Sequence, residues 1–434
     1  MKQIASSIIL LVLVTALNAQ NRNTLWLNGN GATSVSWNRA VTAAQNEGYD
    51  FNRVNTFFYA PHLNGVVGSA NQMNAQLNDE NYTDVLGIGH DGGGIILRQM
   101  ANAQDSRLSA LILDGVPNQG SRVLEAMLPQ GTTNQMTTLI NQVLAFKSNA
   151  NQCNACRIVE AFQDWVNAVN ANEQKYREYQ PNSPVMNNLG TPSMPYAVIW
   201  GNEDEDALVL TRLLGSRAQA VLWGDDTGYL ECYRDEIEDR RRLINDAYFD
   251  GLAQSVITAA SAVGKFLKPT GPNIADGVSK GLEAIHKAIQ AARRRDREMA
   301  ELLECEMVHQ GLNGYWNLIV SDGYTPVTTH ITEEYDCCET CYGEPDAQVQ
   351  GYCFAWCMTL EWPCTRTYTV THYEYEPHDG LLSKSEQLLA GAAKTYEAKK
   401  ANHFQEQFWT QQPIKDAFVD LFNGGAGAAF QVPK

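Results

Sequence analysis

The chain has 434 residues, of which 44% are hydrophobic and nine are tryptophan. This is enough apolar material for one large domain with insertions or for two to three smaller domains. The formal net charge is −17 and no basic stripe offsets it, which excludes nucleic acid and anionic membranes as expected partners. We expect a small-molecule or lipid-like substrate, and the sequence leaves the oligomeric state open.

Residues 1–19 have the pattern of a secretory signal peptide. A lysine at position 2 precedes an apolar run, and small residues lie near Ala19, as they do at cleavage sites of exported proteins. The apolar run is too short to indicate a membrane span, and no later segment is long and apolar enough. We therefore expect a secreted or periplasmic protein without an integral membrane segment.

Ten cysteines in an exported protein predict disulfide bonds. Six of them crowd into one segment, at positions 337, 338, 341, 353, 357 and 364. Zinc binding by this cluster would need reduced thiolates, so an oxidising compartment favours a disulfide-rich, loop-rich segment. The pairing of the cysteines stays open.

Strand and helix patterns alternate over the first 204 residues. Short apolar strands are expected at 24–31, 51–60, 82–90, 109–117 and 194–204. Helical patterns lie between them at 37–48, 93–104 and 121–130. Buried strands that alternate with helices indicate βα units. The predicted fold class is therefore α/β, with a mostly parallel central sheet flanked by helices.

The alternation stops after residue 204. Residues 207–315 have helical spacing, with a break at 268–273 that predicts a helical hairpin. The cysteine-rich segment follows with β-like flanks, and after His378 the core is expected to resume with a helix at 383–400. The predicted organisation is a signal peptide (1–19), a core (20–204 and 375–434) and an insertion (205–374). Ligands bind beyond the carboxyl ends of parallel strands, so we expect the insertion to overhang that edge.

The segment Asp84–Met100 reads "DVLGIGHDGGGIILRQM" and carries the most specific motif. A strand, a glycine-rich turn and the start of a helix follow one another, which is the layout of a nucleophile elbow with the pattern G-x-S-x-G. In this chain the pattern is Gly89-His90-Asp91-Gly92-Gly93. The residue at the tip is Asp91 and not a serine.

Further motifs follow in chain order. Asn28-Gly29 lies in "LWLNGNG", "LDGVPNQGS" covers 113–121, Asp379 lies in "HDGLLSKSEQ" and His403 in "ANHFQEQ". With the elbow, they resemble the ordered motifs of secreted bacterial lipases and esterases of the α/β-hydrolase superfamily. The resemblance covers residues 24–125, 190–204 and 375–410. Asp91 in place of the elbow serine and Asn28 in place of the usual histidine are departures from it.

The resemblance implies a role for each matched position. Asp91 would be the nucleophile, His403 the base, and Asp379 the acid that fixes the tautomer of His403. The oxyanion hole, a pair of backbone N–H donors, would be formed around Asn28, Gly29 and Gly92. No metal and no cofactor are expected. Asp204 is an alternative acid and His378 an alternative base.

Three functions follow from these motifs. The first is hydrolysis of an ester or related small substrate by an Asp91–His403–Asp379 constellation. The second is attack on saturated carbon, because a carboxylate is ionised at neutral pH and needs no activating base; epoxide hydrolases and haloalkane dehalogenases have an elbow that resembles "GHDxGG". The third is a hydrolase fold that binds without turnover. The lost serine favours this function, and the retained positions of acid and base disfavour it.

Overall fold

The computed structural model describes residues 21–29, 36–54, 61–104, 106–129, 158–203, 209–222, 312–313, 316–317, 319–321, 324–335 and 364–434. The predicted signal peptide, the alanine-rich helices beyond residue 222, Asp204 and the side chains of the ten cysteines lie outside the described residues. The chain forms two compact units, Met1–Asp322 with Pro377–Lys434, and Gly323–Glu376.

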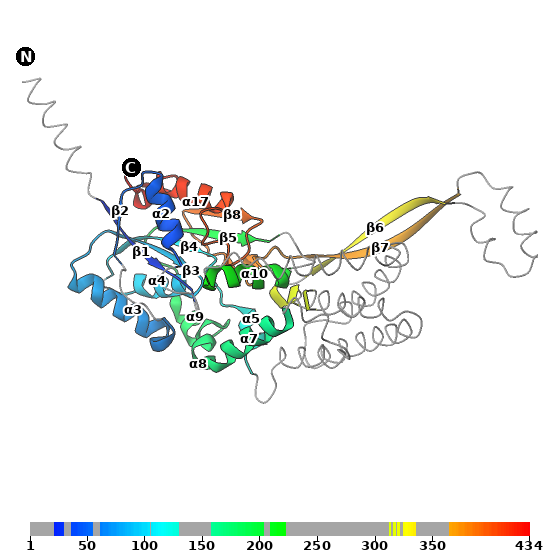
Figure 1. Ribbon diagram of the computed structural model, residues 1–434, viewed down its shortest axis with the longest axis horizontal. Helices are drawn as coiled ribbons and strands as arrows, with labels where there is room; N and C mark the ends of the chain where they lie inside the picture. The colour runs from blue at the N-terminus through cyan, green and yellow to red at the C-terminus, as the bar shows by residue number, and fades with distance from the viewer. Residues whose placement is uncertain are drawn as a thin grey trace, which may run out of the picture. The chain divides into compact units, whose positions relative to one another are not determined.

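A six-stranded sheet forms the centre of the first unit (Figure 1). Its strands are β1 (Arg22–Leu27), β2 (Phe51–Arg53), β3 (Val85–His90), β4 (Leu108–Asp114), β5 (Tyr196–Asn202) and β8 (Lys394–Lys399). They lie in the order β2-β1-β3-β4-β5-β8, and every neighbouring pair is parallel. The prediction of a parallel central sheet is confirmed for the described residues.

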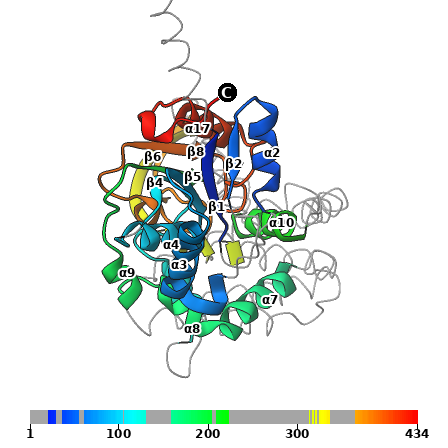
Figure 2. The same ribbon diagram turned by 90° about the vertical axis from the view of Figure 1, so that its left-hand side faces the viewer.

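Helices cover both faces of this sheet (Figures 1 and 2). On one face lie α2 (Asn38–Asn46) and α17 (Gln412–Phe422), and on the other lie α3 (Pro61–Asp79), α4 (Gly92–Ala101) and α9 (Pro184–Leu189). Strand side chains alternate between the two layers: Trp26 packs with Phe418 of α17, whereas Leu25 and Leu27 pack with α3 and α4. Burial on both faces explains why β3, β4 and β5 are almost continuously apolar.

A third apolar cluster lies beside the sheet and is built by α5 (Arg122–Met127), α7 (Ile158–Ala171), α10 (Val209–Leu222) and the side chains of Leu312, Trp316 and Val320. Trp316 is buried in it, with its ring 5.4 Å from the ring of Phe162 and 5.4 Å from that of Trp165. Its indole N–H donates to the carbonyl oxygen of Gly380 at 2.6 Å. The cluster joins parts of the predicted insertion to helices that precede β5. The sequence patterns did not predict α7.

The helix predicted over residues 383–400 is wrong. Only α16 (Lys384–Gln387) is helical there; Ser383 caps it in a capping box with Glu386, and β8 follows. Gly391, with φ 90°, lies between them in a conformation that ends helices. The alanine, lysine and glutamate content of the segment favours helix, but pairing of Lys394–Lys399 with β5 overrides that preference.

Shorter helical segments described in the first unit are α8 (Glu173–Tyr176), η2 (Arg177–Tyr179) and η4 (Ala428–Phe430). The second unit contains β6 (Tyr324–Tyr335) and β7 (Cys364–Tyr375). These strands pair antiparallel from Tyr324 opposite Tyr375 to Tyr335 opposite Cys364. The β-like flanks predicted on either side of the cysteine-rich segment are confirmed as strands.

Candidate functional site

Asp91 lies at the tip of a tight turn between the end of β3 and the start of α4. Its φ of 50° and ψ of −131° are disfavoured for a residue with a side chain, and such a conformation costs roughly 1–3 kcal/mol. The surrounding glycines permit the close packing: a Cβ atom on Gly93 would lie 2.5 Å from the Leu27 carbonyl oxygen, and one on Gly89 2.7 Å from Gly94. The predicted strand, turn and helix are therefore all present.

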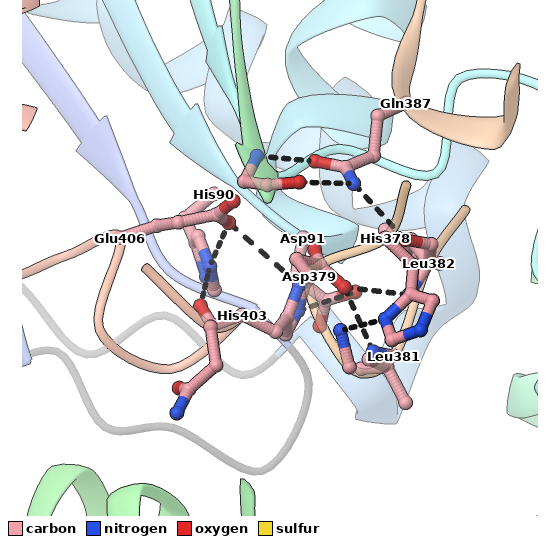
Figure 3. Close-up of polar contacts among 12 residues, drawn as sticks. His90, Asp91, His378, Asp379, Leu381, Leu382, Gln387, His403 and Glu406 are labelled. Carbon is pink, nitrogen blue, oxygen red and sulfur yellow. Dashed lines mark hydrogen bonds and ion pairs between the residues drawn. The ribbon is translucent and has the colours of Figure 1, made fainter. Parts of the chain in front are cut away.

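Asp379 and His403 lie in direct contact beneath this turn (Figure 3). The Oδ2 atom of Asp379 accepts a hydrogen bond from Nδ1 of His403 at 2.8 Å. Its Oδ1 atom accepts from the backbone N–H groups of Leu381 at 2.8 Å and Leu382 at 2.6 Å. Both side chains are buried. With its proton on Nδ1, the neutral imidazole has a lone pair on Nε2.

The free edge of His403 faces Asp91. Nε2 of His403 is 3.9 Å from Oδ1 of Asp91, whose side chain is 20% exposed. Burial by itself lowers the pKa of His403, but the charge and hydrogen bond of Asp379 and the charge of Asp91 outweigh it, so that the pKa is raised. The structure thus brings Asp91, Asp379 and His403 together, as their order in the sequence motifs led us to expect, while their catalytic roles stay a prediction.

The second oxygen of Asp91 lies against the end of β1. A Cβ atom on Gly29 would be 2.3 Å from Oδ2 of Asp91, so only glycine fits there without displacing the carboxylate. Asn28 is buried and its side-chain amide donates to the Gly29 carbonyl at 3.2 Å. Gly92 is the first residue of α4, where backbone N–H groups have no partner within the helix. The residues predicted for the oxyanion hole therefore surround Asp91; their role as donors stays a prediction.

Sequence reasoning missed a buried acid behind His403. Glu406 is fully buried, and its Oε2 atom lies 3.7 Å from Nδ1 of His403 and 3.4 Å from Nε2 of His90. Neither of its carboxyl oxygens has a hydrogen-bond partner among the described residues. The carboxyl group fills space left by Gly115 and Gly201, on which a Cβ atom would lie 1.7 Å and 2.1 Å from its oxygens. The spacing of Glu406 from His403, three residues, was the one available signal.

Burial determines the protonation of this acidic interior. The pKa of Glu406 is raised well above its ordinary value by burial and then by the charges of Asp379, Asp114 and Asp91. Burial and the charge of Asp379 likewise raise the pKa of Asp114, at the end of β4, well above its ordinary value. Carboxyl groups that share a dry site cannot all be ionised. Burial therefore favours the neutral form of both Glu406 and Asp114.

His90 holds the backbone of His403. Its Nε2 atom lies 2.8 Å from the carbonyl oxygen of His403, and its Nδ1 atom lies 2.5 Å from the side-chain amide of Gln407. Burial, followed by the charge of His403, lowers the pKa of His90 well below its ordinary value. A neutral imidazole that donates from Nε2 and accepts at Nδ1 satisfies both contacts.

Among the described residues, one group has a spacing that could hold a metal ion. Ligand atoms of His90, His403 and Glu406 lie within 4.8 Å of one another. Two of these atoms are already hydrogen-bonded, Nε2 of His90 to the backbone of His403 and Nδ1 of His403 to Asp379. A metal ion would have to replace both bonds, since a ligand nitrogen must offer its lone pair. These contacts orient His403, and we assign no metal to them.

The alternative base His378 does not face Asp91. Its Nε2 atom is hydrogen-bonded to the side chain of Asn317, and its Nδ1 atom accepts the backbone N–H of Gly380 at 3.1 Å. The side chain is buried on the far side of the Asp379 loop (Figure 3). The alternative acid Asp204 lies outside the described residues. Of the described histidines, His403 is therefore the better candidate for the base.

A cavity of about 250 Å³ opens above Asp91 and His403. Most of its wall comes from the elements that follow β4 and from the turn after β8, and is apolar: Leu124, Met127, Trp165, Val169, Leu381 and Phe404. Polar side chains also line it, among them Tyr176 at the end of α8 and Arg217 on α10. Burial and the charge of Asp91 raise the pKa of Tyr176 to about 12 against the opposing charge of Arg217. The phenol therefore keeps its proton and remains a hydrogen-bond donor.

The positions of Asp91, Asp379 and His403 relative to the strands of the sheet define the architecture. The elbow follows β3, Asp379 lies between β5 and β8, and His403 follows β8. The core has the α/β-hydrolase fold. No described helix combines the length and hydropathy that a bilayer crossing requires.

Comparisons with known proteins found solved structures of low similarity. No family model and no curated protein matches the sequence. A hydrolase from Oleispira antarctica is 14% identical with a TM-score of 0.27, covering 43% of this chain and 75% of that chain. An esterase from Exiguobacterium antarcticum is 18% identical, with a TM-score of 0.27 and coverage of 42% and 74%. An extracellular α/β-hydrolase from a Paenibacillus species is 14% identical, with a TM-score of 0.24 and coverage of 41% and 76%.

Proposed function

We propose that this protein is a hydrolase in which Asp91 attacks a saturated carbon atom, with an epoxide as the substrate class. The observation that carries the proposal is the orientation of the Asp91 carboxylate. One oxygen faces Nε2 of His403 at 3.9 Å, and the other lies against Gly29. Tyr176, which keeps its proton, lines the same cavity. A nucleophile, a base and a proton donor therefore surround one space.

The first step forms an ester on the enzyme. An oxygen of Asp91 attacks a ring carbon of the epoxide, and the bond from that carbon to the ring oxygen breaks. The electron pair of this bond goes to the ring oxygen, which takes the proton of Tyr176. Because the pKa of that phenol is about 12, the resulting phenolate recovers its proton from water. The product of the step is a hydroxyalkyl ester of Asp91.

The second step releases the diol. His403 takes a proton from a water molecule, which attacks the carboxyl carbon of Asp91. The charge of the tetrahedral intermediate develops on the Asp91 oxygen beside Gly29, where backbone N–H donors would stabilise it. The intermediate collapses, the bond to the alkyl oxygen breaks, and His403 returns its proton to that oxygen. Asp379 stabilises the imidazolium in between.

The ester hydrolysis expected from the sequence fits this geometry less well. A serine nucleophile leaves the oxyanion hole free for the oxygen of an ester substrate. Here Oδ2 of Asp91 lies against Gly29, in that region, and its negative charge would repel the oxyanion of a substrate. In the proposed reaction the same oxygen belongs to the intermediate, so the conflict does not arise.

The test uses the purified protein with epoxides, haloalkanes and acyl esters. We expect turnover of an epoxide, and a single turnover in H₂¹⁸O should place ¹⁸O on the Asp91 peptide. His403→Ala should accumulate a covalent adduct on that peptide, since attack survives without the base and hydrolysis does not. Asp91→Asn should form no adduct, which makes it the matched control.

Three other outcomes would contradict the proposal. If the protein hydrolyses acyl esters without labelling Asp91, the reaction is ester hydrolysis by another route. If the native protein and Asp91→Ser are both inert toward epoxides, haloalkanes and esters although both are folded, the fold is used for binding without turnover. If only Asp91→Ser gains esterase activity, the chain is a lipase-like scaffold that lost activity at this one position.

A further inference from the structure

We infer that Gln407 holds the water molecule that hydrolyses the ester on Asp91, by accepting a hydrogen bond from the proton that His403 does not take. This inference rests on the proposed function, whose second step consumes that water molecule. Gln407 lies in the turn after β8, four residues beyond His403. The residue is 4% exposed, and it lines the cavity together with His403 and Asp91.

His90 fixes the orientation of the Gln407 amide. Nε2 of His90 faces the carbonyl oxygen of His403 at 2.8 Å, and because a carbonyl oxygen only accepts, Nε2 carries the proton. Burial lowers the pKa of His90 and favours the neutral ring, in which Nδ1 is then an acceptor. The Gln407 group that lies 2.5 Å from Nδ1 is therefore the amide nitrogen. The amide oxygen is the end that does not bond His90.

This amide oxygen is available as an acceptor. Among the described residues, the bond to His90 is the one hydrogen bond that the Gln407 side chain makes. Asn172 is the other carboxamide in the described wall of the cavity. Its nitrogen donates to the carbonyl oxygen of Ala168 at 2.9 Å, and its oxygen accepts from Lys175 at 3.3 Å. Gln407 is thus better placed than Asn172 to bind a further polar group in the cavity.

Gln407 belongs to the part of the cavity wall that contains the base. The ring centres of His90 and His403 are 4.6 Å apart, and His90 bonds both the backbone of His403 and the side chain of Gln407. The three residues form one connected group that lines the cavity beside Asp91. The cavity of about 250 Å³ has room for a water molecule, which needs roughly 10–15 Å³, in addition to a compact substrate.

The hydrolytic step requires an acceptor of this kind. A water molecule that attacks the carboxyl carbon of Asp91 directs one lone pair at that carbon and one proton at Nε2 of His403. Its second proton needs an acceptor, because a polar group left unpaired in a closed site costs free energy. With the Gln407 oxygen in that role, two contacts orient the water before it attacks. His403 takes one proton, the other O–H bond stays intact, and the amide gains no proton.

The test measures formation and hydrolysis of the Asp91 ester separately, in single turnovers with an epoxide. Gln407→Met removes the amide and keeps the length of the side chain. We expect it to slow hydrolysis by about tenfold, as for loss of one hydrogen bond, and to leave ester formation unchanged. The pH of half-maximal hydrolysis should not move, because the bond between His403 and Asp379 stays in place.

Two further variants complete this test. Gln407→Glu keeps an acceptor oxygen at the same position and should recover part of the lost rate of hydrolysis. Gln412→Met, the same change on an exposed residue of α17, is the matched control and should hydrolyse the ester at the native rate.

Two kinds of kinetic result would overturn the inference. If Gln407→Met hydrolyses the ester at the native rate, the amide does not hold the attacking water. If hydrolysis slows but the pH of half-maximal rate moves, or if Gln407→Glu is as slow as Gln407→Met, Gln407 acts only through His90 on the position of His403.

A crystal structure of the native protein distinguishes failure of this inference from failure of the proposed reaction, because it needs no turnover. A water molecule bonded to both Oε1 of Gln407 and Nε2 of His403, and missing from Gln407→Met, supports the water site even if no epoxide is hydrolysed. A native structure without a water molecule between these two atoms refutes it.

Discussion

The carboxyl group of Glu406 lies 3.4 Å from the imidazole of His90, and burial acts on the two groups in opposite directions. Burial lowers the pKa of the imidazole well below its ordinary value and raises that of the acid well above it, so it favours the neutral form of each group. Asp379, by contrast, is hydrogen-bonded directly to the Nδ1 atom of His403.

We expect Glu406→Gln to unfold at a higher temperature than the native protein in alkaline solution. The folded pKa of Glu406 is raised, so the folded state holds a proton that the unfolded state releases above pH ~4.5, and stability falls as pH rises from there to the folded pKa. Glutamine removes this loss. A gain of 1 kcal/mol would raise Tm by roughly 2–4 °C for a domain of this kind, and thermal unfolding between pH 4 and 9 measures it.

Glu386→Gln is the contrasting variant for this prediction. Glu386 is also buried with a raised pKa, but it accepts hydrogen bonds from the backbone N–H groups of Arg122 and Ser383 and contacts the Arg122 side chain. Its replacement should lower Tm at neutral pH. A Glu406→Gln variant that is less stable than the native protein at every pH would show that Glu406 is ionised and partnered in the folded state.

The hydrolytic step should accelerate with pH. The folded pKa of His403 is raised above 6.5, and only its neutral form can take a proton from water. The stability that the protonated His403 gives the folded state depends on pH in the opposite direction from the rate. This stability is fully present below pH ~6.5 and is lost as pH rises through the raised folded pKa of His403. Decay of the Asp91 adduct, followed in single turnovers from pH 5 to 10, should rise and then level off.

Asp379→Asn should slow this decay by about 10³-fold or more, because the tautomer and charge of His403 lose their partner. It should also move the rising limb of the profile toward lower pH, since the charge of Asp379 raises the pKa of His403. Formation of the adduct, which needs no base, serves as the internal control. An adduct that forms as slowly as it decays in this variant would contradict the division of roles.

Asp91→Gly should be inactive and more stable than the native protein. The φ of 50° at Asp91 is disfavoured for a residue with a side chain, and glycine adopts it freely. We expect a gain of about 1 kcal/mol in the free energy of unfolding, measured by urea denaturation. Asn182 also has a positive φ, of 62°, and does not line the cavity. Asn182→Gly therefore measures the general effect of placing glycine at a residue with positive φ. An equal gain in both variants would mean that Asp91 holds no particular strain.

Tyr176→Phe should slow opening of an epoxide by about 10²-fold or more, the usual range for loss of a general acid. Attack on a haloalkane should change little, because a halide leaves without a proton. Rapid mixing with detection of the Asp91 adduct separates opening from hydrolysis. Tyr396→Phe, a change on β8 where the hydroxyl bonds Asp420, controls for loss of a phenol elsewhere. Equal rates of opening in Tyr176→Phe and the native protein would remove Tyr176 from the reaction.

The features that were predicted correctly are those encoded by short, local sequence patterns. The elbow follows from glycine spacing: Gly89 is required by contacts with Gly94 and Leu97 within the same strand, turn and helix, and Gly93 by the close approach of Leu27 and Asn28 at the end of β1. The parallel sheet follows from apolar strands that alternate with helices. The positions of Asp379 and His403 came from resemblance, and the structure brings them within 2.8 Å of each other.

The remaining features depend on segments far apart in the chain. Glu406 is buried because Gly115 on one side and Gly201 on the other leave room for its carboxyl group, and no local pattern encodes that space. Tyr176 precedes β5 in the sequence and Arg217 follows it, yet both side chains line the cavity above Asp91. The segment that forms β8 has a helical composition, and only its pairing with β5 makes it a strand.

As the outermost strand on its side of the described sheet, β8 leaves one row of backbone groups unpaired within that sheet. An open edge of this kind can recruit a strand from another molecule, which leads to aggregation. Its exposed positions carry Thr395, Glu397 and Lys399, and an incoming strand would have to desolvate the charges of Glu397 and Lys399. The charged residues that give this segment its helical composition therefore disfavour addition of a further strand at this edge. The sheet can end at β8 without a covering element.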